Sequence, residues 1–348
     1  MTWTNLAQSV LAGDRLALAR TLSQVENGTA EGKSALAELF PHTGNAHLVG
    51  VTGASGTGKS SLVNQLARHY RRPGSTDQPR TVAIVAVDPT SPFTGGAILG
   101  DRIRMRDLAG DPGVFIRSMA TRGSLGGLAS TTSAVVQVLD AAGYDLVLIE
   151  TVGAGQSEID IVRLAHTTVV VEAPGLGDDI QAIKAGIMEI ADVLVVNKAD
   201  LPGVENTERA LRGSLSLSHP PAHRILHHGR LVTVAGQPPP GKDELVWIPP
   251  IQRTVALDGT GIPELAEAIA NHRVYLETTG AWKQRERWRL QTELDLLLQN
   301  KLVTGFRTNL PDGAYEQILD ALVERRISPF EAVEQLVNGA WRKHAEVP

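Results

Sequence analysis

Short apolar runs alternate with amphipathic segments along most of this chain. Five runs are apolar almost throughout, which is typical of strands buried on both faces of a parallel sheet, and they cover residues 47–52, 81–87, 145–149, 167–171 and 192–196. Segments with helical periodicity lie between these runs, at residues 60–70, 125–141 and 179–190. Strands and helices in this order predict an α/β fold with a doubly wound, mostly parallel sheet.

Helical patterns predict extensions at the N-terminal and C-terminal ends of this α/β region. Apolar residues recur at helical spacing between residues 5 and 38. Near the C terminus, two shorter helices are expected near 313–325 and 328–343, after a longer helix whose apolar stripe is Leu290, Leu294, Leu297, Leu298 and Leu302. We therefore expect three regions, an N-terminal helical extension over 1–42, an α/β domain over 43–278 and a C-terminal helical region over 279–348.

Residues 218–250 interrupt this regular order because they are rich in proline and histidine. We interpret this segment as an elaborated connection that carries one hairpin, and not as a separate domain. His219, His223 and His227 recur every four residues, which would align them as metal ligands if the segment were helical. Two prolines directly after His219 interrupt such a helix, so an exposed histidine-rich connection is the better interpretation.

Composition and charge exclude several classes of protein. Hydrophobic residues make up 42% of the 348 residues, which is enough for a packed core and excludes a disordered chain. The net charge of -5 argues against binding to nucleic acid or to an anionic membrane. The absence of cysteine excludes disulfides, thiolate zinc sites and a cysteine nucleophile. Neither a secretion signal nor an apolar run of membrane-spanning length is visible, so we expect a soluble cytoplasmic protein.

A glycine-rich loop follows the first predicted strand. Residues 53–60 read Gly-Ala-Ser-Gly-Thr-Gly-Lys-Ser, the complete GxxxxGK[ST] pattern, and a predicted helix comes directly after them. Glycines allow backbone N–H groups to turn towards phosphates, and the helix adds its positive N-terminal end. We expect Lys59 to reach the β- and γ-phosphates and Ser60 to bind Mg²⁺. The full set of expected phosphate contacts is Gly53, Ser55, Gly56, Thr57, Gly58, Lys59, Ser60 and Ser61.

A second candidate site follows the last predicted strand, in the run Asn197-Lys198-Ala199-Asp200. The carboxylate of Asp200 can accept hydrogen bonds from the ring N–H and the exocyclic amine of guanine, and adenine offers neither donor there. We expect Asn197 to bind the other edge of the base and brace the loop, and the stem of Lys198 to cover the base plane. A further base contact is expected from backbone N–H groups of Thr254, Val255, Ala256 and Leu257.

Three acidic residues are candidates for metal binding, and two of them directly follow predicted strands. Asp88 follows the strand at 81–87, Glu150 follows the strand at 145–149, and Asp101 lies between them. Mg²⁺ prefers oxygen ligands, and one or two carboxylates suffice when several waters remain. Beside Ser60, we expect Asp88, Asp101 and Glu150 to divide among them the roles of direct metal ligand, water-bridged ligand and orienter of the attacking water. Gly153 would bring a backbone N–H to the γ-phosphate.

These motifs together resemble the MeaB/ArgK-type GTPases. The resemblance rests on DPTSPFTGGAILGDRIRM (88–105), RGSLGG (122–127), ETVGAGQSE (150–158) and APGLGD (173–178), followed by the Asn197–Asp200 run in the order of the family. It covers residues 50–262 with high specificity. Two departures are the histidine- and proline-rich stretch 218–240 and Val255, which stands where the family usually has serine.

The resemblance implies a P-loop GTPase that binds GTP or GDP with Mg²⁺ and serves as a G-protein chaperone. Such a protein gates cobalamin delivery to an adenosylcobalamin-dependent acyl-CoA mutase, such as methylmalonyl-CoA mutase, and protects or reactivates that enzyme. It also implies a homodimer formed through the C-terminal region, and a segment at 176–184 that relays the nucleotide state. The chain lacks an Asp-x-His-x-x-Gly motif, so we expect the mutase and not this chain to bind cobalamin.

Two other functions remain open from the sequence. An ArgK-like kinase or ATPase would need a pocket for a phosphate acceptor, and we find no loop with a candidate base for it. A metal-delivery GTPase that matures metalloenzymes would use the histidine stretch, but such proteins often carry cysteine pairs or a denser histidine tract.

Overall fold

The computed structural model describes most of the chain, which divides into two compact units. The described residues are 4–72, 79–88, 105, 107–108, 110–120, 125–151, 164–175, 190–218, 223–227, 230–234 and 246–344. One unit comprises Met1–Arg289 and the other Leu290–Pro348. Helix α11 (Ala281–Thr308) begins in the first unit and ends in the second.

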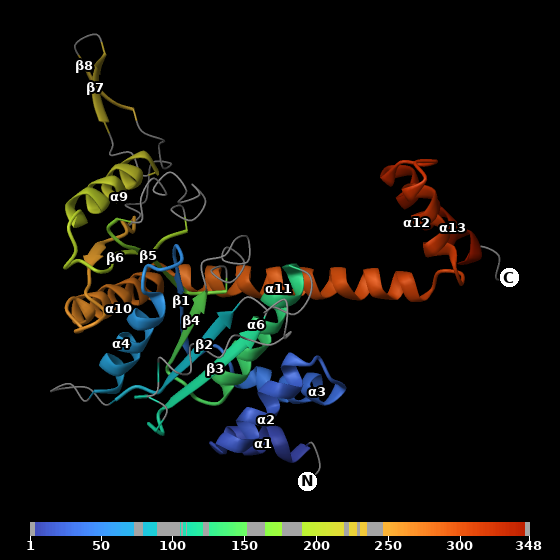
Figure 1. The fold of residues 1–348 in the computed structure, drawn as a ribbon, viewed down its shortest axis with the longest axis horizontal. Helices are drawn as coiled ribbons and strands as arrows, with labels where there is room; N and C mark the ends of the chain where they lie inside the picture. The colour runs from blue at the N-terminus through green and yellow to red at the C-terminus, as the bar shows by residue number, and fades with distance from the viewer. Residues whose placement is uncertain are drawn as a thin grey trace. The chain divides into compact units, whose positions relative to one another are not determined.

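A seven-stranded parallel sheet forms the centre of the first unit (Figure 1). The strand order is β3-β2-β4-β1-β5-β6-β9, and each neighbouring pair is parallel. The strands are β1 (His47–Thr52), β2 (Val82–Asp88), β3 (Val114–Ala120), β4 (Leu146–Thr151), β5 (Thr167–Glu172), β6 (Val193–Val196) and β9 (Ile251–Arg253). The expected doubly wound α/β fold is confirmed, and the five predicted strands are all present.

The two edge strands, β3 and β9, were not predicted. β3 carries Arg117 and Ser118 in its middle, and β9 has only three residues, none of them buried. An edge strand has a neighbour on one side only, so it does not need the continuous apolar run that identified the central strands.

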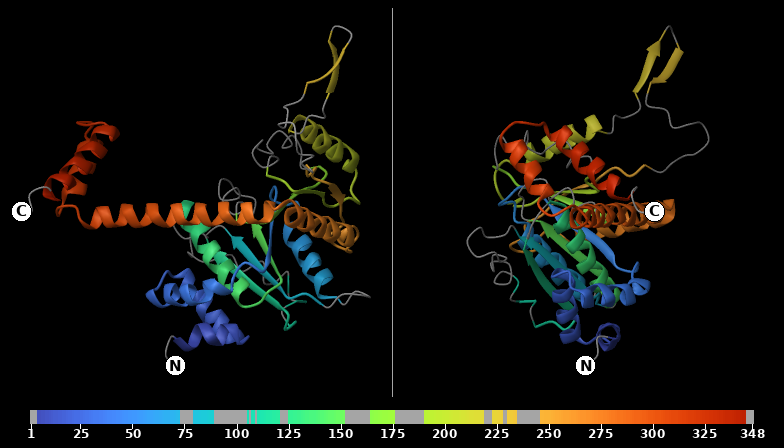
Figure 2. Two further views of the ribbon diagram at one scale, coloured as in Figure 1. Left: turned by 180° about the vertical axis from the view of Figure 1, so that it is seen from behind. Right: turned by 90° about the vertical axis from the view of Figure 1, so that its right-hand side faces the viewer.

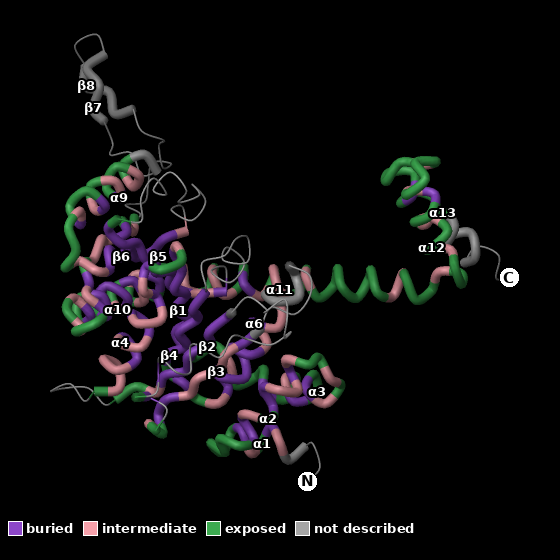
Figure 3. Tube along the Cα trace, viewed as in Figure 1, coloured by how far each residue is buried: buried purple, intermediate pink, exposed green. Residues whose placement is uncertain are grey.

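Helices cover both faces of the sheet. Helices α4 (Lys59–Arg71) and α10 (Ile262–Thr279) contribute to the hydrophobic cluster on one face. Helices α6 (Leu125–Ala141) and α9 (Val204–Ser218) pack against the opposite face. The strands between these layers are mostly buried, as Figure 3 shows in purple. The sheet therefore has an apolar core on each side.

The N-terminal helices belong to the first unit and complete the core beside α6. They are α1 (Thr4–Leu11), α2 (Arg15–Glu26), α3 (Ala30–Leu39) and the short 3-10 helix η1 (Phe40–His42). Leu18, Leu22 and Leu39 are buried in the same cluster as the apolar side chains of α6. An ion pair of 2.6 Å between Arg117 of β3 and Glu26 adds a polar contact to this packing.

Residues 218–250 contain the expected hairpin. Strands β7 (His223–His227) and β8 (Arg230–Val234) pair antiparallel in a two-stranded sheet. His223 and His227 therefore lie on an extended strand and not four residues apart on one face of a helix, which removes the helical alignment that a metal site here would need. The helix expected at 179–190 lies outside the described residues, apart from its last position.

The second unit consists of the end of α11, followed by α12 (Ala314–Val323) and α13 (Pro329–His344). These are the three predicted C-terminal helices, drawn in orange to red in Figure 2. The predicted leucine stripe is largely exposed, with 63% of Leu294 and 61% of Leu302 accessible. Within this unit a groove of about 610 Å³ has an almost entirely apolar lining that includes Phe306, Leu319 and Val333.

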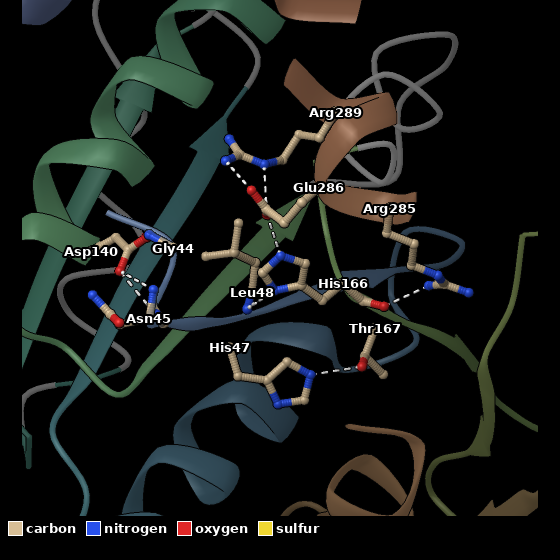
Figure 4. Close-up of polar contacts among 11 residues, drawn as sticks. Gly44, Asn45, His47, Leu48, Asp140, His166, Thr167, Arg285, Glu286 and Arg289 are labelled. Carbon is tan, nitrogen blue, oxygen red and sulfur yellow. Dashed lines mark hydrogen bonds and ion pairs between the residues drawn. The ribbon is translucent and has the colours of Figure 1, made fainter. Parts of the chain in front are cut away.

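The loop that enters β1 is held by one carboxylate from α6 (Figure 4). Asp140 is buried and accepts hydrogen bonds from the backbone N–H groups of Gly44 (2.6 Å), Asn45 (3.1 Å) and Ala46 (2.9 Å). These bonds fix the start of β1, the strand that leads into the glycine-rich loop.

Asp140→Ala should lower the free energy of unfolding by about 3 kcal/mol, because three backbone donors lose a charged acceptor in a buried position. Urea unfolding followed by circular dichroism measures this change. Glu267→Ala, at an exposed position on α10, is the matched control and should change stability by less than about 0.5 kcal/mol. Equal stability of the two variants would contradict the role of Asp140.

Candidate functional site

The glycine-rich loop lies at the carboxyl end of β1, between β1 and α4. Gly53 has a φ of 140°, and a Cβ atom there would lie 2.0 Å from the carbonyl oxygen of Val171 in β5. No other residue fits this position, because both the backbone conformation and the contact exclude a side chain. Gly58 has a φ of 91°, and a Cβ atom there would lie 2.5 Å from the side-chain nitrogen of Asn197. Both glycines are thus required by the packing of the loop on the sheet.

The polar side chains of the loop lie against its own backbone and against β4. The Lys59 Nζ atom donates to the carbonyl oxygens of Gly53 at 2.7 Å and of Ala54 at 2.9 Å. The Ser60 hydroxyl donates to Glu150 Oε1 at 2.5 Å. Glu150 is buried, with 3% of its surface accessible. The structure therefore brings together the expected phosphate-binding lysine, the expected metal-binding serine and one of the expected carboxylates.

Asn197 joins the loop to the segment after β9. Its Nδ2 atom donates to the carbonyl oxygen of Thr57 at 2.8 Å. Its Oδ1 atom accepts from the Thr254 hydroxyl and from the Ala256 N–H, both at 3.1 Å. The bracing role expected of Asn197 is thus visible in its contacts, and the Thr254 hydroxyl is a partner that the sequence did not predict.

Lys198 and Asp200 lie beside the same loop. Lys198 has a φ of 55°, and its Nζ atom donates to the carbonyl oxygen of Gly56 at 2.8 Å. Asp200 is exposed at the end of this run. A carboxylate in this position is accessible to a base that approaches over the Lys198 stem.

The segment 254–257 uses part of its backbone internally. The Val255 N–H donates to the carbonyl oxygen of Thr260 at 2.9 Å, and the Ala256 N–H is taken by Asn197. The Thr254 N–H also donates to the carbonyl oxygen of Val196 at 3.0 Å, so three of the four N–H groups expected to bind the base have partners within the protein. Leu257 is 87% exposed, so a contact of its backbone N–H with the base remains a prediction.

The other expected residues are only partly described. Asp88 is the last residue of β2, two positions beyond Ala86, which pairs with Glu150 in β4. Its backbone therefore lies at the same end of the sheet as Glu150. Asp101, Gly153 and the segment 176–184 lie outside the described residues.

This arrangement has the chemistry of a site for a phosphorylated ligand with a divalent cation. Backbone N–H groups at the start of α4, together with Lys59, offer positive charge to an anion. The Ser60 hydroxyl and the Glu150 carboxylate are hard oxygen donors in direct contact, and they fit Mg²⁺. Asn197 hydrogen-bonds both to the candidate phosphate-binding loop, at Thr57, and to the candidate base-binding segment, at Ala256.

Comparisons with known proteins identify the family of this chain. A family model described as methylmalonyl Co-A mutase-associated GTPase MeaB matches residues 18–310. A putative GTPase of Pyrococcus abyssi is 42% identical over 96% of this chain and 95% of its own length. The GTPase ArgK of Escherichia coli is 35% identical over 93% of this chain and 92% of its own length.

A solved structure shares the same fold. The crystal structure of a LAO/AO transport system kinase superposes with a TM-score of 0.68, at 27% identity and with 97% of each chain covered. Among the described residues, no helix is long and apolar enough to cross a bilayer.

Lys59→Ala should reduce GTP hydrolysis at least about 100-fold, because it removes the charge that we expect at the β- and γ-phosphates. Release of inorganic phosphate from GTP measures the effect. Lys33→Ala, at an exposed position on α3, is the control and should keep the parent rate. Hydrolysis by the Lys59 variant within a few-fold of the parent would place the active site elsewhere.

Proposed function

The chain belongs to the MeaB family of methylmalonyl-CoA mutase-associated GTPases, and we propose that it acts as a G-protein chaperone for an adenosylcobalamin-dependent acyl-CoA mutase. In this role GTP hydrolysis gates delivery of the cobalamin cofactor and protects or reactivates the mutase. The observation that carries the proposal is the match of the family over 18–310 together with the contact between Ser60 and Glu150, which links the phosphate loop to a candidate metal ligand.

In the proposed mechanism, each residue of the loop has one task. The backbone N–H groups of 53–61 bind the phosphates, and Lys59 exchanges its contacts with the Gly53 and Ala54 carbonyls for the β- and γ-phosphate oxygens. Ser60 and Glu150, with Asp88 and Asp101, hold Mg²⁺ or the waters around it. When bound, Mg²⁺ neutralises the charge that develops on the phosphates. Gly153 donates a backbone N–H to the γ-phosphate.

Base selectivity falls to the Asn197–Asp200 run and to the backbone of Leu257. Asp200 accepts from the ring N–H and the amine of guanine, while Lys198 covers the base plane. The exposure of Asp200 and the bracing of Asn197 against Thr57 support this assignment. ATP is disfavoured because adenine presents an acceptor where Asp200 needs a donor, which leaves the carboxylate without a partner.

Asp200→Asn should weaken GTP binding and strengthen XTP binding, each by ~2–3 kcal/mol, roughly 30- to 150-fold in affinity. The new amide N–H₂ faces the guanine amine, a donor against a donor, whereas xanthine has a carbonyl there. Competition binding of GTP, XTP and ATP to parent and variant measures the change. A parent that prefers ATP, or a variant that still prefers GTP fully, would show that 197–200 does not select the base.

The proposed partner is the mutase, and this chain is not expected to bind cobalamin itself. The family description associates these GTPases with methylmalonyl-CoA mutase. We further propose that the chain acts as a homodimer. Two apolar features are exposed, the leucine stripe of α11 and the groove of the second unit. Large exposed apolar surfaces are uncommon on monomers, so these features support an apolar contact with a second copy of the chain.

Stimulation of hydrolysis by a mutase tests the chaperone proposal. We expect GTP hydrolysis by this chain to rise at least several-fold when a methylmalonyl- or isobutyryl-CoA mutase of the same organism is added. A chaperone that is coupled to the mutase must bind it with different affinities in its GTP and GDP states, so the mutase must in turn affect the nucleotide reaction. The Lys59→Ala variant with the mutase is the control for contaminating activity. An unchanged rate with each mutase, together with no complex in gel filtration, would refute the partnership but not the GTPase activity.

A kinase is the second candidate, favoured by one observation, the description of the solved structure as a LAO/AO transport system kinase. It predicts transfer of the γ-phosphate to an acceptor molecule, whereas a GTPase releases inorganic phosphate. Quantitative recovery of phosphate from GTP without an added acceptor distinguishes the two. A metal-delivery role has less support, because His223 and His227 lie on a strand.

A further inference from the structure

A cluster of ionisable groups, some buried and some partly accessible, lies at the amino ends of β5 and β6, the opposite ends from the glycine-rich loop. Figure 4 shows four of its members, His166, Arg285, Glu286 and Arg289. We call it the α11 anchor and define it as Asp192, His166, Arg285, Glu286 and Arg289. The last three lie in the first turns of α11 and belong, like the others, to the first unit. The cluster therefore fixes the point at which α11 begins.

One half of the anchor is a bidentate ion pair. Arg285 donates to both carboxylate oxygens of Asp192, at 2.7 and 2.8 Å, and also to the backbone carbonyl of His166. Asp192 additionally accepts from the Thr168 N–H at 2.8 Å. Burial raises the pKa of Asp192, but its hydrogen bonds with Arg285 and His272 outweigh burial and lower it. Asp192 is therefore a carboxylate at any pH near neutrality.

The other half depends on the imidazole of His166. Its Nδ1 atom accepts from the Leu48 N–H at 3.1 Å, so the ring proton is on Nε2, which donates to Glu286 Oε1 at 2.5 Å. Arg289 holds the same carboxylate at 3.0 and 3.1 Å. Burial raises the pKa of Glu286, but the hydrogen bonds from His166 and Arg289 outweigh burial and lower it to about 2.

A second proton on His166 conflicts with this arrangement. It would have to sit on Nδ1, where the ring already faces the Leu48 N–H as an acceptor, so two donors would meet. The ring is also enclosed, because only 2% of His166 is accessible and Trp282 packs on it with ring centroids 3.9 Å apart. The neutral imidazole is thus the form that fits between β1 and α11.

The surrounding charges do not reverse this preference. His166 faces His47 from β1, Asp140 from α6, and Glu286 with Arg289 from α11. Burial lowers the pKa of His166, and Arg289 lowers it further, while Glu286 and Asp140 raise it without restoring the usual value. Burial likewise places the pKa of His47 well below its ordinary value, and the nearby His166, Arg273 and His272 lower it further.

Beside His166, His47 contacts the Thr167 hydroxyl at 2.7 Å, and the same hydroxyl contacts His272 Nδ1 at 2.9 Å. His272 Nε2 lies 3.2 Å from Asp192 Oδ1. His47 stacks on His166, so contacts through His47, Thr167 and His272 connect the two halves of the anchor.

We propose that the α11 anchor is a proton-sensitive joint, which holds the start of α11 on the sheet while His166 is neutral and releases it in an acidic medium. The direction of the pH effect follows from the linkage between proton binding and anchoring. A released His166 takes up a proton near its ordinary pKa of ~6.5, whereas the anchored one resists it. Anchoring is therefore complete above pH ~6.5 and weakens as the pH falls. Release concerns residues 281–289, the part of α11 that belongs to the first unit.

Hydrogen–deuterium exchange of the full-length protein tests the proposal. Protection of residues 281–289, corrected for the intrinsic pH effect, should fall by up to about 10-fold between pH ~7.5 and ~5.5, since pH ~5.5 is about one unit below the ordinary histidine pKa. Protection in β4 should stay constant, which shows that the unit as a whole remains folded. Equal protection of 281–289 at both pH values would overturn the proposal.

Two variants identify the responsible group. His166→Gln keeps a donor for Glu286, but glutamine does not titrate. In this variant, the protection of residues 281–289 from exchange should therefore depend little on pH. His42→Gln, which changes an exposed histidine of η1, should behave like the parent. If the His166 variant showed the same pH-dependent loss as the parent, His166 would not be the sensor.

If the His166 variant does not fold, a measurement on the parent protein tests the proposal instead. Imidazole ¹⁵N shifts should show the Nε2–H tautomer of His166 at pH ~7.5. A His166 that is already charged at pH ~7.5 would overturn the proposal. Neither outcome depends on GTP or on a mutase, so the joint can fail without affecting the proposed function.

Discussion

Parallel pairing of β1 with β4 and β5 is the constraint on which both ends of the sheet depend. At the carboxyl end it brings Ser60, directly after the loop, to Glu150 of β4, and it presses Gly53 against the carbonyl of Val171 in β5. At the amino end, the same pairing places Leu48 beside His166. A shift in register would break the candidate nucleotide site and the α11 anchor together.

The two ends use buried polar groups in different ways. At the loop, the contacts of Lys59 with carbonyl oxygens are ones that phosphate oxygens can replace, because the lysine keeps its charge and only changes acceptor. At the anchor, Arg285 and Asp192 satisfy each other in a fixed bidentate geometry. Loss of one partner there would leave a buried charge, so such pairs enforce one arrangement more than they add stability.

Apolar surface distinguishes the two units. The first unit buries its apolar side chains on both faces of the sheet, whereas the second leaves the stripe of α11 and a groove accessible. Short helices with one apolar face need a second surface to cover it, which the sheet provides in the first unit. The proposed homodimer would meet this need in the second unit.

The sequence alone predicted the central strands, helices α4 and α6 and the local motifs, because a glycine-rich loop or the Asn197–Asp200 run carries its chemistry within a few consecutive residues. It did not predict helix α9, which follows β6. It did not predict the edge strand β3, which lacks a continuous apolar run. The sequence placed Ser60 and Glu150, 90 residues apart, at one expected metal site, but their direct contact came from the tertiary structure. Tertiary structure alone decided the contact of His166 with Glu286, 120 residues away. Contacts this distant follow from sheet order and register, and an isolated histidine carries no local pattern that names its partner.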